Sequence, residues 1–361
     1  MATSPKACCA PLAAALAAVL ASYSMSVGAQ PAAPQDSVRF FTYENDSFFH
    51  TDRYYTNGVQ FSVKHGSDLR GAFARGWTDP LCRWLGCADA LLLTSQTNVG
   101  QLMYTPANIS VSAPQPLDRP WAGMLYYEQS YAFLSPDQRT LTTLSAEAGV
   151  TGPLSLAEPT QKTLHHLFHR PTPEGWDNQI GGSLGLMVSA ERRHALDVLS
   201  ADLGHDVRLN TAAYWRVAAG NIMSYAAGGI AVVVGKDLPL VSPPPPGIGN
   251  KLAREAVPPA LLTSCIASWL QCTAFGSIEG RLVGYNVFID GRLFHDDSVV
   301  QRRTFVHDAV LGMRFDFPHT RTAGHGPWFI QVKATRRSPE IKSWLPIPRQ
   351  RVLALTLGTE F

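Results

Sequence analysis

The sequence carries little charge for its length, and no long hydrophobic run occurs after residue 30. Charged residues make up 16% of the chain, against about 25% in an average soluble domain. The formal net charge is +2 and no Lys/Arg block occurs, so we expect no nucleic-acid partner. A transmembrane helix needs about 18 consecutive apolar residues. Without such a run, we expect no membrane-spanning helix.

The first 29 residues have the features of a secretory signal peptide. Lys6 supplies a short positive region, 10–21 is an apolar run rich in Ala and Leu, and 27–29 offers small residues before a cut near Gln30. This pattern is typical of export rather than of folded structure. We therefore expect a signal peptide over 1–29 and a mature domain over 30–361.

Cysteine is also scarce outside this leader. Four cysteines follow it, in two close pairs: Cys82 with Cys87, and Cys265 with Cys272. In an exported chain, such spacing favours loop-closing disulfides over a metal site. Four free thiols are the alternative.

What the mature chain does have is alternation of apolar and polar residues. Segments 144–150, 328–335 and 353–357 each place apolar side chains on one face. Such strands build either a soluble sandwich or a membrane barrel. Three observations favour the barrel: the export signal, segment lengths near the roughly 9 to 11 residues that a tilted spanning strand needs, and the terminal Phe361. A terminal Phe on an alternating last strand resembles the signal recognised by the barrel-assembly machinery.

The fold class that follows is all-β: a twelve-stranded antiparallel transmembrane β-barrel with a short helix in an extracellular loop. Strands are predicted near 38–45, 54–65, 94–103, 121–134, 140–150, 179–191, 196–209, 221–235, 276–289, 301–317, 327–337 and 350–361. With both ends in the periplasm, the extracellular connections are 46–53, 104–120, 151–178, a short 210–220 link, 290–300 and 338–349.

Hard-oxygen side chains gather around the first predicted hairpin. Asn45, Asp46 and Thr56 offer an amide carbonyl, a carboxylate and a hydroxyl, the donor types that Ca²⁺ prefers. Thr56 shares its parity with Gln60, on the polar face of the second strand. The alternative is an Asx-type turn with a Thr hydrogen bond.

One predicted extracellular loop contains a helix between Pro159 and Pro171. Gln161 and His165 stand four residues apart on one face of it, and His165 could act as a general base because imidazole titrates near working pH. A solvated helix histidine is the simpler interpretation. Zinc held by the neighbouring histidines is disfavoured because no Glu follows the first of them.

Taken together, five motifs resemble the lipid A 3'-O-deacylase (LpxR-like) family of outer-membrane β-barrels. They are Glu44-Asn45-Asp46, residues 54–58, Asp118-Arg119-Pro120, the helix with Gln161 and His165, and residues 175–179. Their order and spacing match along most of the mature chain.

The resemblance implies a calcium-dependent esterase site at the outer rim of the barrel, facing lipid A of lipopolysaccharide in the outer leaflet. Asn45 and Asp46 fall on the family's Asn-Asp pair, and Thr56 on its essential hydroxyl residue. Gln161 and His165 fall on its Gln-x-x-x-His helix. We therefore expect Ca-assisted, His-activated water attack on an acyl ester in the bacterial outer membrane.

Two departures from the family pattern bear on the substrate. Residues 104–117 contain no basic side chain, where the family has a Lys-Arg pair, and Pro171 stands where it has an acid. Another acylated lipid, or lost activity, would explain both. The alternative from a different class is a non-catalytic barrel, either a small channel or a structural surface protein. A third, a soluble periplasmic β-sandwich, would purify without detergent.

Overall fold

The structure is a computed structural model, and the chain divides into two units, Met1–Gln35 and Asp36–Phe361. The residues that it describes all lie in the second unit: 37–49, 51–66, 68, 70–204, 206–236, 238–241, 264–267, 270–295, 300–317, 327–343 and 347–360. The predicted signal peptide and Phe361 lie outside the described residues.

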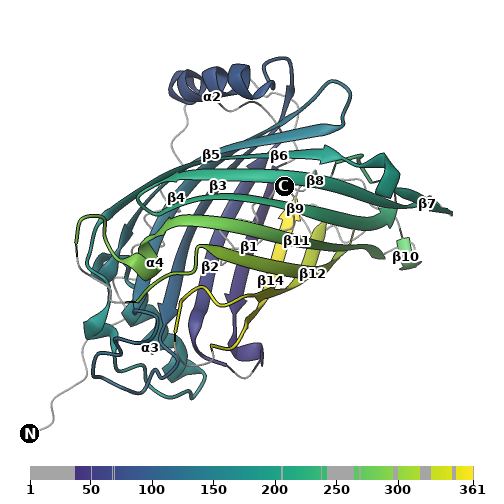
Figure 1. Ribbon diagram of the computed structural model, residues 1–361. Helices are drawn as coiled ribbons and strands as arrows, with labels where there is room; N and C mark the ends of the chain where they lie inside the picture. The colour runs from purple at the N-terminus through teal and green to yellow at the C-terminus, as the bar shows by residue number, and fades with distance from the viewer. Residues whose placement is uncertain are drawn as a thin grey trace, which may run out of the picture. The chain divides into compact units, whose positions relative to one another are not determined.

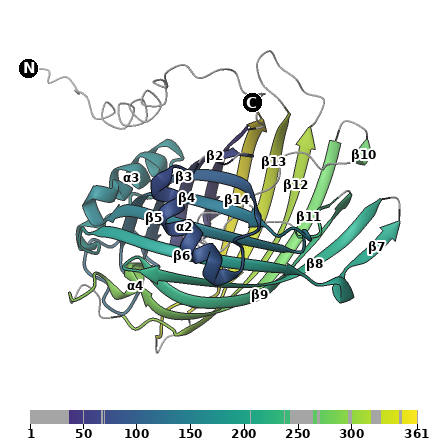
Figure 2. The ribbon, with the colours of Figure 1, turned by 90° about the horizontal axis from the view of Figure 1, so that it is seen from above.

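Twelve long strands close into an antiparallel barrel (Figures 1 and 2). They are β1 (Ser37–Asn45), β2 (Tyr54–His65), β3 (Leu91–Thr105), β4 (Ala122–Leu134), β5 (Thr140–Thr151), β6 (Leu184–Ala195), β8 (Val207–Gly220), β9 (Met223–Lys236), β11 (Leu270–Asn286), β12 (Phe305–Phe317), β13 (Trp328–Arg337) and β14 (Gln350–Glu360). Closure comes from β14 pairing with β1, with Val38 opposite Glu360 and Asn45 opposite Leu353. The predicted twelve-stranded barrel is confirmed. Two short strands, β7 (Ala201–Gly204) and β10 (Ser264–Ala267), extend β8 and β11 at their edges.

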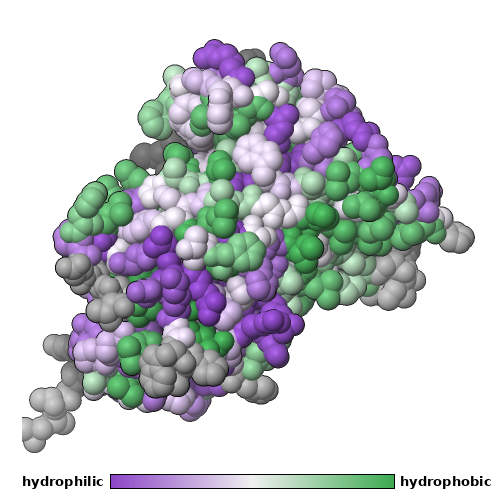
Figure 3. Space-filling model, viewed as in Figure 1, coloured by the Kyte–Doolittle hydropathy of each residue, from purple (hydrophilic) through white to green (hydrophobic). Residues whose placement is uncertain are grey.

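The polar residues of the strands face the inside of the barrel. On β2, Gln60, Ser62 and Lys64 are buried, whereas Phe61 is 53% exposed on the outer face. Hydrophobic side chains accordingly cover much of the outer wall over β8 to β12 in the space-filling view (Figure 3). A closed sheet with a polar interior and an apolar exterior is the arrangement of a membrane barrel. It rules out the β-sandwich.

One predicted strand was wrong. The sequence pattern suggested a strand over 196–209 and an extracellular link over 210–220, but β8 spans Val207–Gly220 and only 221–222 link it to β9. Residues before β8 instead form the short helix η5 (Asp197–Leu199) and β7. Asn221 makes the tight link possible, because its side chain accepts from the Leu186 N–H at 2.6 Å and donates to the Leu184 carbonyl at 2.8 Å.

Short helices occupy the connections at both ends. Those at the end that carries the predicted extracellular loops are η2 (Ser47–Phe49), η3 (Gly152–Ser155), α3 (Ala157–Leu167), η4 (Trp176–Asn178) and α4 (Val287–Asp290); α2 (Ala72–Leu85) lies at the end where β1 begins and β14 stops. The predicted helix in the loop between the fifth and sixth strands is thus present as α3. Among the described residues, no helix is both long and apolar enough to span a membrane.

The cysteine prediction holds for the residues that the structure describes. Cys82 and Cys87 form a disulfide, and Cys272 is also disulfide-bonded. The side chain of Cys265 lies outside the described residues.

Candidate active site

Asp46 is a buried carboxylate at the end of β1. Its Oδ2 atom accepts a hydrogen bond from the backbone N–H of Arg53 at 2.9 Å. Its Oδ1 atom has no hydrogen-bond partner among the described residues. Burial raises the pKa of Asp46 to about 7, although the hydrogen bonds that it accepts oppose the shift. An unpartnered buried carboxylate oxygen is costly, so this atom has capacity for a proton or a cation.

Asn45 and Thr56 lie beside Asp46 at the adjoining ends of β1 and β2. Asn45 Oδ1 accepts from the Ser47 N–H at 2.6 Å, and Thr56 Oγ1 lies 2.6 Å from Thr105 Oγ1. In the part of the chain that the structure describes, no three His, Cys, Asp or Glu side chains converge as a metal site. A cation held here would therefore need amide and hydroxyl oxygens alongside Asp46.

Helix α3 turns its polar face toward the barrel. Ala157, Gln161 and His165 are buried, whereas Leu167 is 64% exposed. The close approach depends on Gly123 of β4, where a Cβ atom would lie 2.3 Å from Ala157 Cβ. Since such contacts do not occur between real side chains, Gly123 is what lets α3 pack here.

His165 is held from both ring nitrogens. Its Nδ1 atom lies 2.6 Å from the Pro171 carbonyl oxygen. A carbonyl can only accept, so Nδ1 carries a proton and Nε2 is the nitrogen that can accept one. Nε2 lies 3.4 Å from Asp52 Oδ2. The backbone of Pro171 thus contacts His165 at the position where the family pattern has an acid.

Asp52 is the functional candidate that the sequence analysis missed. Through its contact with His165, Asp52 brings its loop against α3. Burial raises the pKa of Asp52, while His165 and Arg170 lower it. Its Oδ1 atom is buried without a partner among the described residues. No spacing rule distinguishes Asp52 from an ordinary loop aspartate. The signal available was its membership of the same polar hairpin loop as Asp46.

Gln161 is held by Trp176 rather than by His165. Trp176 Nε1 donates to Gln161 Oε1 at 2.8 Å, and the Trp176 ring packs against Trp121 with centroids 5.0 Å apart. This fixes Gln161 Nε2, which is buried with no partner among the described residues. The amide N–H group of Gln161 is therefore a buried donor that remains available, four residues before His165 on the same helix.

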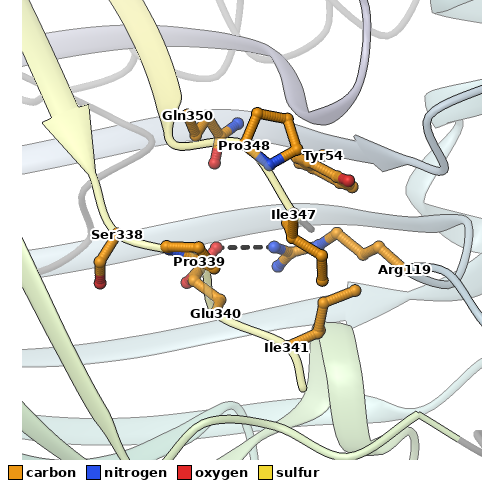
Figure 4. Close-up of a pocket in the computed structure, with 9 residues that line it drawn as sticks. All are labelled: Tyr54, Arg119, Ser338, Pro339, Glu340, Ile341, Ile347, Pro348 and Gln350. Carbon is orange, nitrogen blue, oxygen red and sulfur yellow. Dashed lines mark hydrogen bonds and ion pairs between the residues drawn. The ribbon is translucent and has the colours of Figure 1, made fainter. Parts of the chain in front are cut away.

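Arg119 sits in a pocket at the same end of the barrel. The pocket encloses about 260 Å³ of space that is partly open to solvent, and Figure 4 shows Arg119 meeting Glu340 inside it. Their Nη1 and Oε2 atoms are 2.6 Å apart, and both side chains are buried. The guanidinium also lies over the Tyr104 ring, 4.2 Å from its centroid. The side chain of Arg119 therefore pairs with Glu340 rather than with its sequence neighbour Asp118.

The site thus combines an imidazole whose Nε2 atom lies beside the Asp52 carboxylate, a buried amide donor and a buried carboxylate with an unpartnered oxygen. General bases and N–H donors of this kind serve hydrolytic reactions. The fold and this loop cluster define the class: a membrane β-barrel with a cluster of polar and titratable side chains at one rim.

The family model of outer membrane protein LpxR matches residues 12–344. The chain therefore belongs to the LpxR family of outer-membrane proteins, and its location is the bacterial outer membrane.

The solved structure of LpxR agrees with the fold. LpxR from Salmonella typhimurium superposes with a TM-score of 0.69 at 16% identity, covering 90% of this chain and 100% of that one. The β domain of the Bordetella autotransporter BrkA, at 9% identity with 91% of this chain and 100% of that one covered, has a TM-score of 0.41. No curated protein sequence matches this chain significantly.

Proposed function

We propose that the protein removes an ester-linked acyl chain from lipid A of lipopolysaccharide, the 3'-O-deacylation, with His165 activating the attacking water. Membership of the LpxR family supports an outer-membrane lipid A deacylase. The observation that carries the mechanism is the pair of contacts on His165, from Pro171 to Nδ1 and from Asp52 to Nε2.

In this proposal Nε2 takes the proton of the attacking water. The Pro171 carbonyl keeps the proton on Nδ1 and so keeps Nε2 available. The nearby Asp52 carboxylate stabilises the imidazolium that forms, and the imidazolium then returns the proton to the leaving alkoxide. Gln161 Nε2 is a donor for the oxyanion that develops on the ester carbonyl. No covalent serine intermediate is required.

Ca²⁺ is the cofactor we propose, held by Asn45, Asp46 and Thr56. The unpartnered, buried Oδ1 of Asp46 supports a cation here, and all three side chains offer the hard oxygen atoms that calcium prefers. A bound calcium ion would supply an electrophile for the ester carbonyl. It would also keep Asp46 ionised at neutral pH, since a nearby positive charge favours the carboxylate.

Mass spectrometry of lipid A from cells that express the full chain tests this proposal. Wild type with calcium should release one acyl chain, and chelation should stop the release. His165→Ala should lose roughly a factor of 10² to 10⁴ in rate, the usual contribution of a general base. His166→Ala, an exposed neighbour on the same helix, is the matched control and should retain activity.

Each result has a distinct meaning. Unchanged lipid A with wild-type protein folded in the outer membrane would overturn the proposed reaction. Full activity in His165→Ala would leave the reaction standing and remove His165 from it. Activity that survives chelation would remove Ca²⁺.

The channel alternative finds no support in the interior of the barrel. Arg216 and Arg281 are buried there and paired with Glu191 and Asp308, each at 2.6 Å. Paired, buried side chains fill space that a conducting pore would need.

A further inference from the structure

Helix α2 packs against the outside of the barrel wall. In Figure 1 it lies outside the ring of strands, above β5, and in Figure 2, seen from above, it is drawn over β4 to β6. Its inner face, with Ala74 and Cys82, is buried against Tyr131, Phe133 and Leu144 of β4 and β5.

The residues that α2 covers belong to the lipid-facing side of the wall. On β4, Tyr131 and Phe133 have the same parity as Leu125 and Tyr127, which are 36% and 48% exposed. The opposite parity carries Glu128, which is buried inside the barrel. Because side chains alternate between the two faces of a strand, α2 replaces lipid over part of the wall.

One flank of α2 remains both apolar and exposed. Phe73 is 90% exposed and Trp84 is 79% exposed, and at about 100° per residue they project in nearly the same direction. Pro80 lies between them on this flank. Two fully exposed aromatic side chains on one helix would be unfavourable in water.

The other exposed flank of α2 is charged. Arg75, Asp79 and Arg83 are spaced by four residues and lie on the side away from the aromatic pair. A helix whose exposed surface divides into an aromatic and a charged flank suits the boundary between acyl chains and head groups, with Trp at the interface.

The helix is fixed to the wall at its C-terminal end. Arg192, on the outer face of β6, donates to the Leu85 carbonyl oxygen. The Cys82–Cys87 disulfide closes the turn, and Gly86 adopts the left-handed conformation, with φ of 72°, that ends the helix. The direction in which the aromatic flank faces is therefore set by the fold.

We propose that α2 is an interfacial helix that inserts Phe73 and Trp84 into the phospholipid leaflet at the end of the barrel where β1 begins and β14 stops. The occupant is lipid because the aromatic flank continues the lipid-facing wall of an outer-membrane protein. Arg75 and Arg83 then lie at head-group level, where their guanidinium groups contact phosphates.

Fluorescence quenching in proteoliposomes tests this. The full chain is refolded into phosphatidylethanolamine and phosphatidylglycerol vesicles, with or without brominated acyl chains, and the Trp84 signal is the difference between wild type and Trp84→Phe. Brominated lipid should remove most of that signal, and aqueous iodide should leave it unchanged. Lipid hydrolysis is not the readout, so the result is independent of the proposed function.

Two matched variants locate the flank. In the Trp84→Phe background, Phe73→Trp should be quenched by brominated lipid, as Trp84 is. Arg83→Trp in the same background moves the indole by one residue to the charged flank, and it should respond to iodide instead. Near-ultraviolet circular dichroism and heat-resistant migration on gels verify that each variant is folded.

Two outcomes overturn the proposal. Quenching of Trp84 by iodide and not by brominated lipid would place the aromatic flank in water. Protection from both quenchers would mean that protein covers it, either a second copy of this chain or a periplasmic partner.

Discussion

The two ring nitrogens of His165 lie in different environments, and the proposed role as a base depends on this difference. The Pro171 carbonyl occupies Nδ1, and the Asp52 carboxylate lies beside Nε2. In the proposed reaction, the Asp52 carboxylate would attract the imidazolium that forms when His165 takes a proton from water.

Asp52→Asn removes this charge while keeping the shape of the side chain. Hydrogen bonds to charged groups contribute about 1.5–3 kcal/mol, so we expect kcat to fall about tenfold to a hundredfold with little change in KM. Asp177→Asn, an exposed neighbour in the loop after α3, should be silent. An unchanged kcat in Asp52→Asn would show that Asp52 has no part in the reaction.

The Arg119–Glu340 pair joins two distant segments of the chain at the barrel mouth. Glu340→Gln leaves the Arg119 guanidinium buried without its counter-ion, a change that typically costs about 3–5 kcal/mol. We expect a lower urea midpoint for unfolding in detergent, measured at pH 7. Glu174→Gln, at an exposed site, is the control.

The pH dependence of that difference follows from the pKa of Glu340. Burial alone would raise this pKa, but Arg119 and Arg337 bring it below its ordinary value. A depressed folded pKa means that the stabilisation is complete above the unfolded pKa of about 4.3 and is lost as the pH falls through the folded value. Wild type and Glu340→Gln should therefore converge in stability at strongly acidic pH. A difference that persists there would contradict this account.

The sequence motifs predicted the side chains of the candidate site, but they did not predict the neighbouring groups that position those side chains. Asn45, Asp46, Thr56, Gln161 and His165 carry their chemistry in the residue type. The Pro171 carbonyl is a backbone atom, and its direction depends on how the chain leaves α3. Residue type therefore gives no signal for it.

At the scale of elements, α3 is unusual because it buries polar residues and exposes apolar ones. Leu167 and Phe168 are 64% and 61% exposed, while Gln161 and His165 face the barrel. The apolar stripe of this helix, Leu164, Leu167 and Phe168, is visible in the sequence. Its direction is not, because which face is buried depends on the strand that the helix meets.

Gly123→Ala tests how strictly β4 positions α3. The added Cβ would lie 2.3 Å from Ser155 Oγ as well as from Ala157 Cβ, so the segment from η3 to α3 must move outward. Because displacements of about 1 Å can cost a hundredfold in rate, we expect at least a tenfold loss of hydrolysis with the barrel intact on heat-modifiability gels. Gly228→Ala, where the nearest atom is 3.6 Å away, should have little effect. Equal activity in the two variants would argue against a positioning role for Gly123.

Alternation located most strands but failed between 196 and 220. Residues 201–204 alternate weakly and pair only with the edge of β8, whereas β8 itself is rich in Ala and carries Arg216 on its inward face. In a sequence, a charged residue such as Arg216 within an apolar segment suggests a loop rather than a strand. It is accommodated because Glu191 of the neighbouring strand pairs with it at 2.6 Å.

At the scale of the whole molecule, the packing of the barrel interior bears on whether the protein can conduct ions through its lumen. Several charged residues in the interior form pairs and triads: Asp308 with Arg281 and Arg337, and Lys333 with Glu44. Burial of several charges is tolerated because each is compensated by a neighbour. Such a network stabilises one packed arrangement of the lumen.

We therefore expect the purified chain to give no steady conductance in planar lipid bilayers. Ions would have to displace side chains such as Arg281, which is 1% exposed and lies 2.6 Å from Asp308, and the cost of separating buried charges opposes this. The same preparation should hydrolyse lipid A in detergent, which verifies that it is folded. A porin reconstituted in parallel verifies that the bilayers register open channels. Steady single-channel currents from the wild type would mean that the lumen rearranges in the membrane, and the non-catalytic channel would then become the better description of this barrel.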